Sequence, residues 1–400
     1  MFMQRCYVPV VSILLALLVG NWLAKSYAFD PLMAAQNQRI RFQKGGDLSS
    51  AGSLTAEESR LAEALLDTGR TSDKNRTRLL YVGNSQTLAI MDQQPGDIIA
   101  PQWLQILLAR ETSSGAQSID VQIGSLPNLT TTELLIKLVA AGAESPRQID
   151  MLLTATVLEE FRGLGVRDEV RAALESPAAK ADLISLAEGN TDLAAARKVL
   201  EPFISSRSEP STAAGDARSG NSIAETIEQR LQLAAEKMPL FTQRQNLQVA
   251  INLTYNAWRD RLLGITSSSP RPVPDPSYRA TLELMELVLR YARSKNIEVI
   301  FYLAPLRLDV QPNPNLPSDV ERFRRDVPAL CRRYNVTCLD YADLIPENFW
   351  TNYPDFGSGA GQRDFAHFTG AAHKILAEKL ISDIGPQLIR HAQAKRASEQ

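Results

Sequence analysis

The chain has 400 residues, of which 44% are hydrophobic and 22% are charged, and its formal net charge is −2 at pH 7. This composition is typical of a globular protein with a sizeable core and excludes a disordered or fibrous chain. With 43 Lys and Arg against 45 Asp and Glu, the chain has no basic excess, so we expect no nucleic-acid partner. The three histidines, three cysteines and absence of CxxC, HExxH and GxxxxGK[ST] motifs exclude zinc fingers, HExxH metalloproteases and P-loop ATPases. We therefore expect no metal and no cofactor.

The first predicted element is an apolar segment at the N-terminus. An uncharged, apolar run of about 17 residues extends from Tyr7 to Leu23, between Arg5 and Lys25, which is short for a transmembrane helix and long for a signal-peptide core. Ser26-Tyr27-Ala28 supplies small residues of the kind that signal peptidase requires. Residues 1–28 are therefore predicted to be either a cleaved signal peptide or a retained signal anchor. Both alternatives place the remainder outside the cytoplasm, as a membrane-anchored or periplasmic protein.

A polar stretch separates this segment from the predicted domain. Residues 29–75 are predicted to be a stalk or linker with a short helix over 55–67. From residue 76 strand and helix patterns alternate, which favours a parallel sheet covered by helices on both faces. The predicted strands are 79–82, 119–123 and 149–155, and the predicted helices are 103–108 and 131–141.

The middle of the chain has helical patterns only. Residues 157–263 are therefore predicted to form a helical insertion in the sheet domain. Within it, residues 204–222 are rich in Ser, Gly, Ala and Pro, which predicts a mobile loop. Four prolines between Ser267 and Pro276 then return the chain to the sheet.

The alternation resumes after these prolines. Strands are predicted at 297–303 and 335–340, helices at 278–294, 317–333 and 370–384, and a charged tail at 387–400. The result is five parallel strands with right-handed crossovers, as in the flavodoxin-like fold. We therefore predict a three-layer α/β domain over residues 76–386. Near its end, Cys331 and Cys338 are separated by six residues, and both a disulfide and two free thiols are compatible with this spacing.

Ser85 directly follows the first predicted strand, in the segment Gly83-Asn84-Ser85. Ligands of doubly wound sheets bind at the carboxyl ends of the strands. A serine at a sharp strand-to-helix turn projects its hydroxyl from this edge, and its own N–H can stabilise an oxyanion. A plain turn is the alternative for so short a motif. Ser85 is therefore a candidate nucleophile and a candidate oxyanion donor.

A serine nucleophile needs a base, and the histidines are the candidates. His391 lies in the predicted tail and His373 lies within the predicted closing helix, whereas His367 precedes that helix. Asp364 lies three residues before His367 in the same predicted loop. A carboxylate at this position can orient the imidazole and stabilise the imidazolium. The sequence thus predicts a catalytic triad of Ser85, His367 and Asp364.

The two motifs together, Gly83-Asn84-Ser85 and Asp364-x-x-His367, resemble those of the SGNH, or GDSL-type, hydrolases. The resemblance covers about residues 75–160 and 276–386 and leaves out the insertion. With its apolar N-terminal segment, the chain is similar to the exported DltD-like and AlgJ/AlgX-like branch of that superfamily.

The resemblance implies a function. Ser85 would be the nucleophile, His367 the base and Asp364 its orienting partner in an exported serine esterase or O-acyltransferase that forms an acyl-enzyme. The expected substrates are acyl groups of an extracytoplasmic polysaccharide or another envelope polymer. The expected partners are this polymer, the membrane and a membrane-bound O-acyltransferase.

The family also places oxyanion donors after the second and third strands. After the second strand, Gly124 and Asn128 are the candidates, and Asn128 is favoured because asparagine tolerates a left-handed backbone. After the third strand the asparagine of the family is absent, so either Thr154 or Thr156 donates or the third donor is missing. Losing one donor typically costs about 2.7–4 kcal/mol of barrier. The alternative function is therefore a catalytically weak or inactive SGNH-like accessory protein that binds beside a membrane-bound O-acyltransferase.

Two arginines are candidates for substrate binding, because a guanidinium binds carboxylates and phosphates well. Arg307 follows the fourth predicted strand, at the expected site edge, and a surface ion pair with Asp309 is its alternative role. Arg162 lies near the start of the insertion.

Overall fold

The computed structural model describes residues 40–42, 76–91, 97–111, 119–143, 149–205, 258–260, 262–352 and 362–399. The chain divides into two compact units. Residues 40–207, 267–354 and 359–400 form the unit that contains the sheet. In the other unit the described residues are 258–260 and 262–266, where Trp258, Leu262 and Leu263 are exposed. The predicted N-terminal segment, the predicted 55–67 helix and nearly all of the predicted 204–222 loop lie outside the described residues. Among the described helices, none has the length and apolar character needed to cross a membrane.

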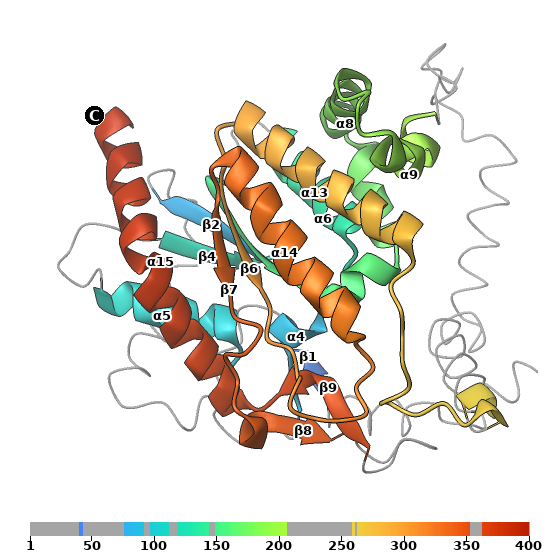
Figure 1. The fold of residues 1–400 in the computed structure, drawn as a ribbon. Coiled ribbons are helices and arrows are strands. Elements are labelled where there is room, and N and C mark those ends of the chain that lie inside the picture. Colours follow the sequence, from blue (N-terminus) through green and yellow to red (C-terminus); the bar gives the residue numbers. More distant parts are fainter. Residues whose placement is uncertain are drawn as a thin grey trace, which may run out of the picture. The chain divides into compact units, whose positions relative to one another are not determined.

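Five parallel strands form the central sheet, in the order β4-β2-β5-β6-β7 (Figure 1). Numbered along the chain within this sheet, the order is 2-1-3-4-5, which is that of the flavodoxin-like fold. The predicted fold class is therefore confirmed. The direction of the connections reverses between β2 and β5, so ligands are expected at the carboxyl ends of these two strands. The strands are β2 (Thr77–Val82), β4 (Ile119–Ile123), β5 (Met151–Thr156), β6 (Glu298–Leu303) and β7 (Thr337–Asp340).

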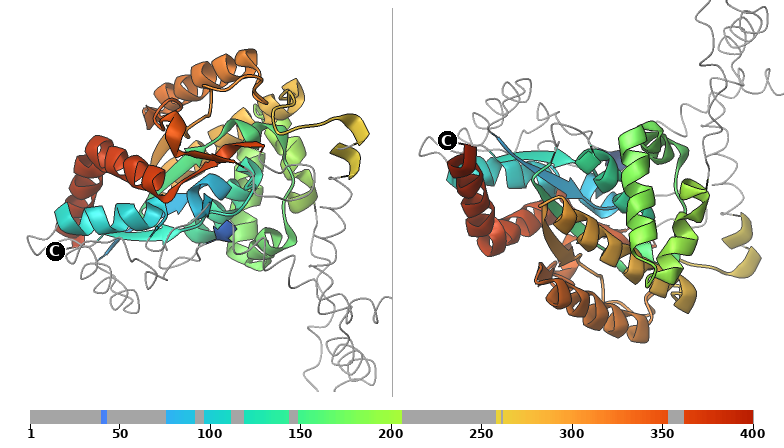
Figure 2. Two further views of the ribbon diagram at one scale, coloured as in Figure 1. Left: turned by 90° about the horizontal axis from the view of Figure 1, so that it is seen from below. Right: turned by 90° about the horizontal axis from the view of Figure 1, so that it is seen from above.

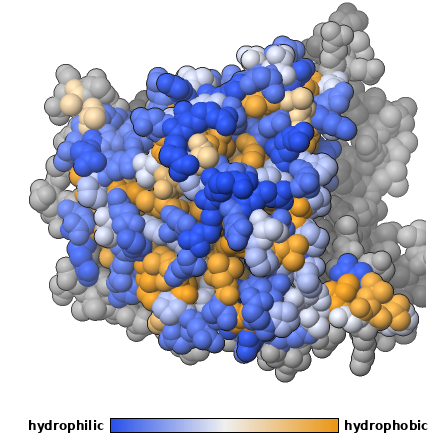
Figure 3. Space-filling view, in the orientation of Figure 1, coloured by the Kyte–Doolittle hydropathy of each residue, from blue (hydrophilic) through white to orange (hydrophobic). Residues whose placement is uncertain are grey.

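Helices cover both faces of the sheet (Figures 1 and 2). One face packs against α6 (Thr131–Ala143), α13 (Asp275–Ser294) and α14 (Pro317–Tyr334), and the other packs against α5 (Ala100–Glu111) and α15 (Gly370–Glu399). Neighbouring side chains on β5 divide between these layers, with Leu152 on the first side and Leu153 on the second. The outward side of α13 and α14 is hydrophilic (Figure 3) and carries ion pairs such as Arg290–Glu286.

The closing helix α15 is longer than the sequence predicts. It continues through Pro386 to Glu399, where the sequence predicts an end at 384 and a tail over 387–400. The reason is burial, because Leu388 and Ala392 extend its apolar side onto the same core as Ile384. His391, placed by the sequence in a tail, forms an ion pair with Glu298 of β6.

Two small antiparallel pairs were not predicted. β1 (Ile40–Phe42), within the range expected to be a linker, pairs with β3 (Ala89–Met91), and β8 (Trp350–Asn352) pairs with β9 (Arg363–Phe368). β9 carries Asp364 and His367, so these two residues lie on a strand and not in a loop. β1, β3 and β8 have three residues each, which is too few for a period-two hydrophobic pattern to stand out.

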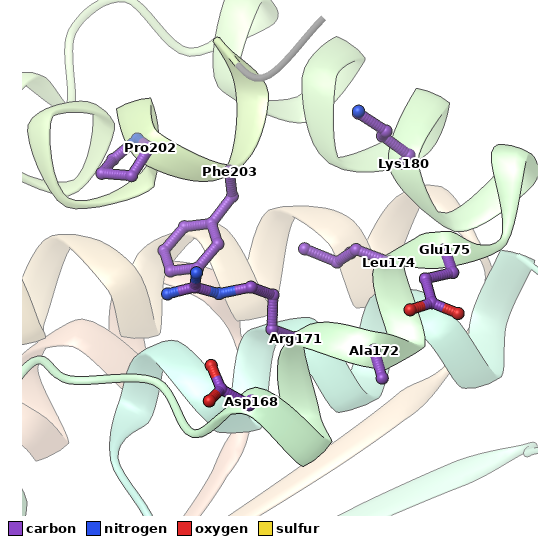
Figure 4. Close-up of a pocket in the computed structure, with 8 residues that line it drawn as sticks. All are labelled: Asp168, Arg171, Ala172, Leu174, Glu175, Lys180, Pro202 and Phe203. Carbon is purple, nitrogen blue, oxygen red and sulfur yellow. The ribbon is translucent and has the colours of Figure 1, made fainter. Parts of the chain in front are cut away.

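The insertion is helical in its described part, as predicted. After β5 follow η1 (Leu158–Arg162), α7 (Asp168–Arg171), η2 (Ala172–Glu175), α8 (Pro177–Gly189) and α9 (Ala194–Ile204). Leu183 of α8 and Leu200 of α9 are fully buried in the core beneath α6 and α13. A cavity of about 450 Å³ lies among these short helices, where the Arg171 guanidinium stacks on the Phe203 ring (Figure 4). The part of the insertion from Leu158 to Ile204 is therefore packed onto the sheet domain.

Cys331 of α14 and Cys338 of β7 are free thiols in contact with each other. The hydrogen bond between them raises the pKa of Cys331, and burial raises it further. The same hydrogen bond lowers the pKa of Cys338. Of the two alternatives that the spacing allows, the structure contains the thiol pair.

Candidate active site

Ser85 is the first residue of α4 (Ser85–Leu88), directly after β2 and next to β5. The Asn84 side chain accepts a hydrogen bond from the Gln86 amide at 2.9 Å, and the Asn84 carbonyl accepts from the Thr87 amide at 3.1 Å. Asn84, at the position where the family that the motifs resemble usually has aspartate, thus caps α4 as an aspartate would. The backbone amides of Gln86 and Thr87 are thus paired, whereas the backbone amide of Ser85 has no hydrogen-bond partner among the described residues.

Gly83 lets the strand close tightly onto this turn. A Cβ at this position would lie 2.5 Å from Thr87 Cγ2 and 3.0 Å from Ala155 Cβ. Contacts this short force neighbouring atoms to move, because protein interiors are close-packed. The glycine is therefore required by the approach of β5 and α4, and not only by the turn.

Replacing Gly83 by alanine is expected to lower the free energy of unfolding by about 1–3 kcal/mol, the usual cost of overpacking. Gly163→Ala is the matched control, because a Cβ at Gly163 would meet no atom within 4 Å. Urea unfolding followed by circular dichroism measures both variants. Equal midpoints for the two would show that the Gly83 turn has room for a methyl group.

The side chains of Ser85, His367 and Asp364 form one hydrogen-bonded chain. His367 Nε2 lies 2.9 Å from Ser85 Oγ, although 282 residues separate them, and His367 Nδ1 lies 2.8 Å from Asp364 Oδ2. The other Asp364 oxygen accepts from the amides of Ala366 at 2.8 Å and His367 at 3.1 Å. Because an ionised carboxylate only accepts, the Nδ1 proton points to Asp364, and Nε2 is left to accept from the serine hydroxyl.

Burial and strand pairing hold the triad side chains in place. Asp364 is fully buried, Ser85 is 9% exposed and the His367 side chain is 12% exposed, so solvent reaches the serine and the imidazole but not the carboxylate. Thr351 of β8 donates its hydroxyl to the His367 carbonyl at 3.2 Å. The acid and the base are therefore held by a paired strand.

Arg307 follows β6 and lies beside the triad, as the sequence predicts, but its guanidinium is bound within the protein. It is 6% exposed, and its Nη1 donates to the carbonyls of Thr351 at 2.8 Å and Asp364 at 3.0 Å. Burial lowers the pKa of Arg307, and the negative charges of Asp309 and Asp364 oppose this effect. The guanidinium thus binds the backbone of β8 and β9 through Nη1, and no ion pair between Arg307 and Asp309 occurs among the described residues.

Arg162 is likewise bound within the protein. Its Nε donates to the Arg271 carbonyl at 3.0 Å, and its Nη2 donates to Asn315 Oδ1 at 2.7 Å. Burial lowers its pKa, while Glu159, at 3.7 Å from Nη1, raises it. The predicted role in substrate binding is therefore replaced by a structural one, in which Arg162 ties the insertion to the loop after β6.

The two candidate oxyanion donors after β4, Gly124 and Asn128, have different hydrogen bonding and backbone conformation. The Gly124 amide donates to the Tyr81 carbonyl at 2.9 Å, so it extends the sheet and cannot bind an oxyanion. Asn128 has the predicted left-handed backbone, with φ of 51°. This conformation belongs to a turn after Pro127, closed by a hydrogen bond from Leu129 to Leu126, and the Asn128 side chain is exposed.

Thr154 and Thr156 are buried on β5, next to Val82 and Leu303 respectively. Within the described ranges, no hydrogen bond joins Gly124, Asn128 or either threonine to the triad. The Ser85 amide, which belongs to the nucleophile itself, has no hydrogen-bond partner among the described residues, whereas the Gly124 amide is paired with Tyr81. The described residues also contain no cluster of three or more His, Cys, Asp or Glu side chains that could hold a metal ion.

His373 is the residue near the site that the sequence did not indicate. Its Nδ1 accepts from the Ala100 amide at 3.1 Å and its Nε2 donates to the Ala89 carbonyl at 3.2 Å, which requires a neutral ring. Complete burial lowers the pKa of His373 to about 3. Its ring also packs on Phe368 of β9, with centroids 4.6 Å apart. His373 therefore joins β3, α5 and β9 beneath the triad.

Comparisons with known proteins give neighbours among solved structures only. No family model and no curated protein matches the chain. A candidate acylhydrolase from Bacteroides fragilis aligns with 86% of this chain and 99% of its own, at 10% identity and a TM-score of 0.32. A GDSL-like lipase from Bacteroides thetaiotaomicron aligns with 80% of this chain and 95% of its own, at 9% identity and a TM-score of 0.28. The function therefore has to be inferred from the side chains around Ser85.

Proposed function

We propose that this chain is a serine esterase or O-acyltransferase of the SGNH type. The observation that carries the proposal is the hydrogen-bonded chain from Ser85 through His367 to the buried Asp364. A serine hydroxyl becomes a nucleophile when a positioned base takes its proton, and an imidazole becomes an effective base when a carboxylate fixes its tautomer. The three side chains meet both requirements.

The reaction proceeds in two halves. Ser85 Oγ attacks the carbonyl carbon of an ester while His367 Nε2 takes the hydroxyl proton, and Asp364 stabilises the resulting imidazolium. The Ser85 amide donates to the oxyanion. Collapse of this intermediate breaks the ester bond, and His367 gives its proton to the leaving oxygen. Water or a sugar hydroxyl then attacks the acyl-enzyme while His367 takes its proton, and His367 gives this proton to Ser85 Oγ as the acyl group leaves.

The proposed substrates are O-acyl groups of an extracytoplasmic polysaccharide or other envelope polymer. Two sequence features support this proposal, namely the similarity of the motifs to the exported DltD-like and AlgJ/AlgX-like branch and the apolar segment within residues 1–28. The same features favour a membrane-anchored or periplasmic location and a membrane-bound O-acyltransferase as partner.

A second candidate function is that of a binding or accessory protein with little or no catalysis, working beside such an acyltransferase. The observation that favours it is the short supply of oxyanion donors. The Gly124 amide is bound in the sheet, and no asparagine follows β5. Each donor missing from the usual set raises the barrier by about 2.7–4 kcal/mol.

A fluorophosphonate probe distinguishes the two candidates, because it labels only a serine that is activated as a nucleophile. We expect the wild type to be labelled and Ser85→Ala to lose the label completely. Ser125→Ala is the control, since Ser125 is equally buried at the same sheet edge and its hydroxyl donates to the Tyr81 carbonyl.

Each other outcome has a clear meaning. Equal labelling of the wild type and Ser85→Ala would remove Ser85 from the mechanism. A folded wild type that takes no label would instead support the binding protein. A chromogenic acetyl ester, assayed with and without a polysaccharide acceptor, then separates hydrolysis from transfer.

A further inference from the structure

The loop between β6 and α14, residues 304–316, contacts both halves of the triad. We call it the β6 loop. Gln86, next to the nucleophile, donates its side-chain Nε2 to the Pro305 carbonyl at 2.9 Å. Arg307, two residues further along the loop, donates to the carbonyl of Asp364 at 3.0 Å. Both donor side chains are buried, with 4% exposure for Gln86 and 6% for Arg307.

The β6 loop is itself held by hydrogen bonds. The Leu306 amide donates to the Ala342 carbonyl at 2.8 Å, which anchors the loop beyond β7. Asn313 donates its side-chain Nδ2 to the carbonyl of Arg307 at 2.6 Å and accepts from the amide of Asn315 at 2.9 Å. The loop is therefore a rigid support, because its backbone groups are paired on both sides of Arg307.

Arg307 makes two contacts with a single guanidinium nitrogen. One nitrogen, Nη1, lies between the carbonyls of Thr351 on β8 and Asp364 on β9, and thus bridges the hairpin at the residue that orients His367. The positive charge also lies within electrostatic reach of the Asp364 carboxylate. Burying a charged guanidinium is costly unless its contacts compensate for the lost hydration, so the position is demanding for a residue without a role.

We propose that Arg307 is a positioning residue for the triad, which fixes Asp364 and His367 relative to Ser85 by joining β9 to the loop that also holds the nucleophile turn. Its role rests on the proposed esterase or acyltransferase function. Arg307 touches no substrate, so its loss changes the rate of acyl transfer and leaves substrate binding intact. A displacement of reacting groups by about 1 Å costs about 100-fold in rate.

The test compares Arg307→Met with Arg162→Met in the full chain. Arg162 is the matched control, because it ties Asn315 of the same loop but makes no contact with β9. We expect Arg307→Met to lower kcat on a chromogenic acetyl ester by about 100-fold with KM within about 3-fold of the wild type. Arg162→Met is expected to keep the wild-type kcat, and Arg307→Lys, which keeps the charge, is expected to recover part of the loss.

A second readout does not depend on activity. The proton on His367 Nδ1 gives a low-field NMR resonance while it is hydrogen-bonded to Asp364, and we expect this resonance to weaken or vanish in Arg307→Met but to persist in Arg162→Met. If the wild type proves inactive, the proposed function fails and the resonance alone decides the role of Arg307. If Arg307→Met does not fold, Arg307→Lys decides it.

Three results would overturn the proposal. The first is a wild-type kcat in Arg307→Met, and the second is a loss confined to KM, which would return Arg307 to substrate binding. The third is an unchanged His367 resonance in a folded variant.

Discussion

Alanine in place of His367 is expected to lower turnover of a chromogenic acetyl ester by about 10⁴-fold or more, the usual cost of losing the base of a serine triad. His367 Nε2 lies 2.9 Å from Ser85 Oγ, so without it the hydroxyl proton has no acceptor. His373 cannot substitute, because both of its ring nitrogens are bound to backbone groups.

Asp364→Asn extends the same test to the acid. An asparagine keeps the shape of the carboxyl group, but its amide can donate to His367 Nδ1 and thus favour the wrong tautomer, at a cost of about 10⁴-fold in kcat. The control is His391→Ala, which removes a histidine that pairs with Glu298 far from the triad. Retention of more than a tenth of the wild-type rate by His367→Ala would exclude His367 as the base.

Spacing along the chain was sufficient to predict the sheet and the meeting of the three triad side chains. The strands could be predicted because β2, β5 and β6 are apolar runs bounded by polar segments, as expected for a sheet covered on both faces. The meeting of Ser85 with His367 follows from that topology, because segments that follow parallel strands gather at one edge.

The roles of the two arginines could not be predicted in the same way. A position after a strand says that a side chain is near the site edge, but not whether it points to solvent or into the protein. Arg307 binds within the protein because carbonyls of β8 and β9 accept hydrogen bonds from its guanidinium. The sequence did not predict the pairing of these two strands. Arg162 likewise donates to Asn315, a contact across 153 positions of the sequence that its place after β5 does not predict.

Gly124 shows a further limit of reasoning from motifs. A glycine after the second strand matches the position of an oxyanion donor, yet its amide continues the hydrogen bonding of β4 to Tyr81 by one residue. A Cβ there would lie 2.9 Å from Leu80 Cδ1, so the strand packs closely on side chains of β2 at this residue. Whether an amide is free depends on where a strand stops pairing, and strand ends are the least certain part of any sequence-based prediction.

His373 makes a second, separate prediction, because its burial couples folding to pH. The pKa of His373 is about 3 in the folded protein, against 6.5 for an ordinary histidine. Between these two values the unfolded chain binds a proton that the folded protein excludes. Stability is therefore fully present above pH 6.5 and falls as the pH drops below it, by up to about 1.4 kcal/mol for each pH unit.

Replacing His373 by glutamine should remove this acid sensitivity, because a glutamine can accept from Ala100 and donate to Ala89 without titrating. Urea unfolding at pH 7 and pH 4.5 measures the effect. We expect the wild type to lose about 2–3 kcal/mol more than His373→Gln between these two values. His391→Gln, which alters the half-buried pair with Glu298, is the control for a general effect of losing a histidine. Parallel losses in the wild type and His373→Gln would mean that the buried imidazole takes up its proton without unfolding. In that case the hydrogen bonds that join β3 and α5 beneath the triad would not depend on a neutral ring.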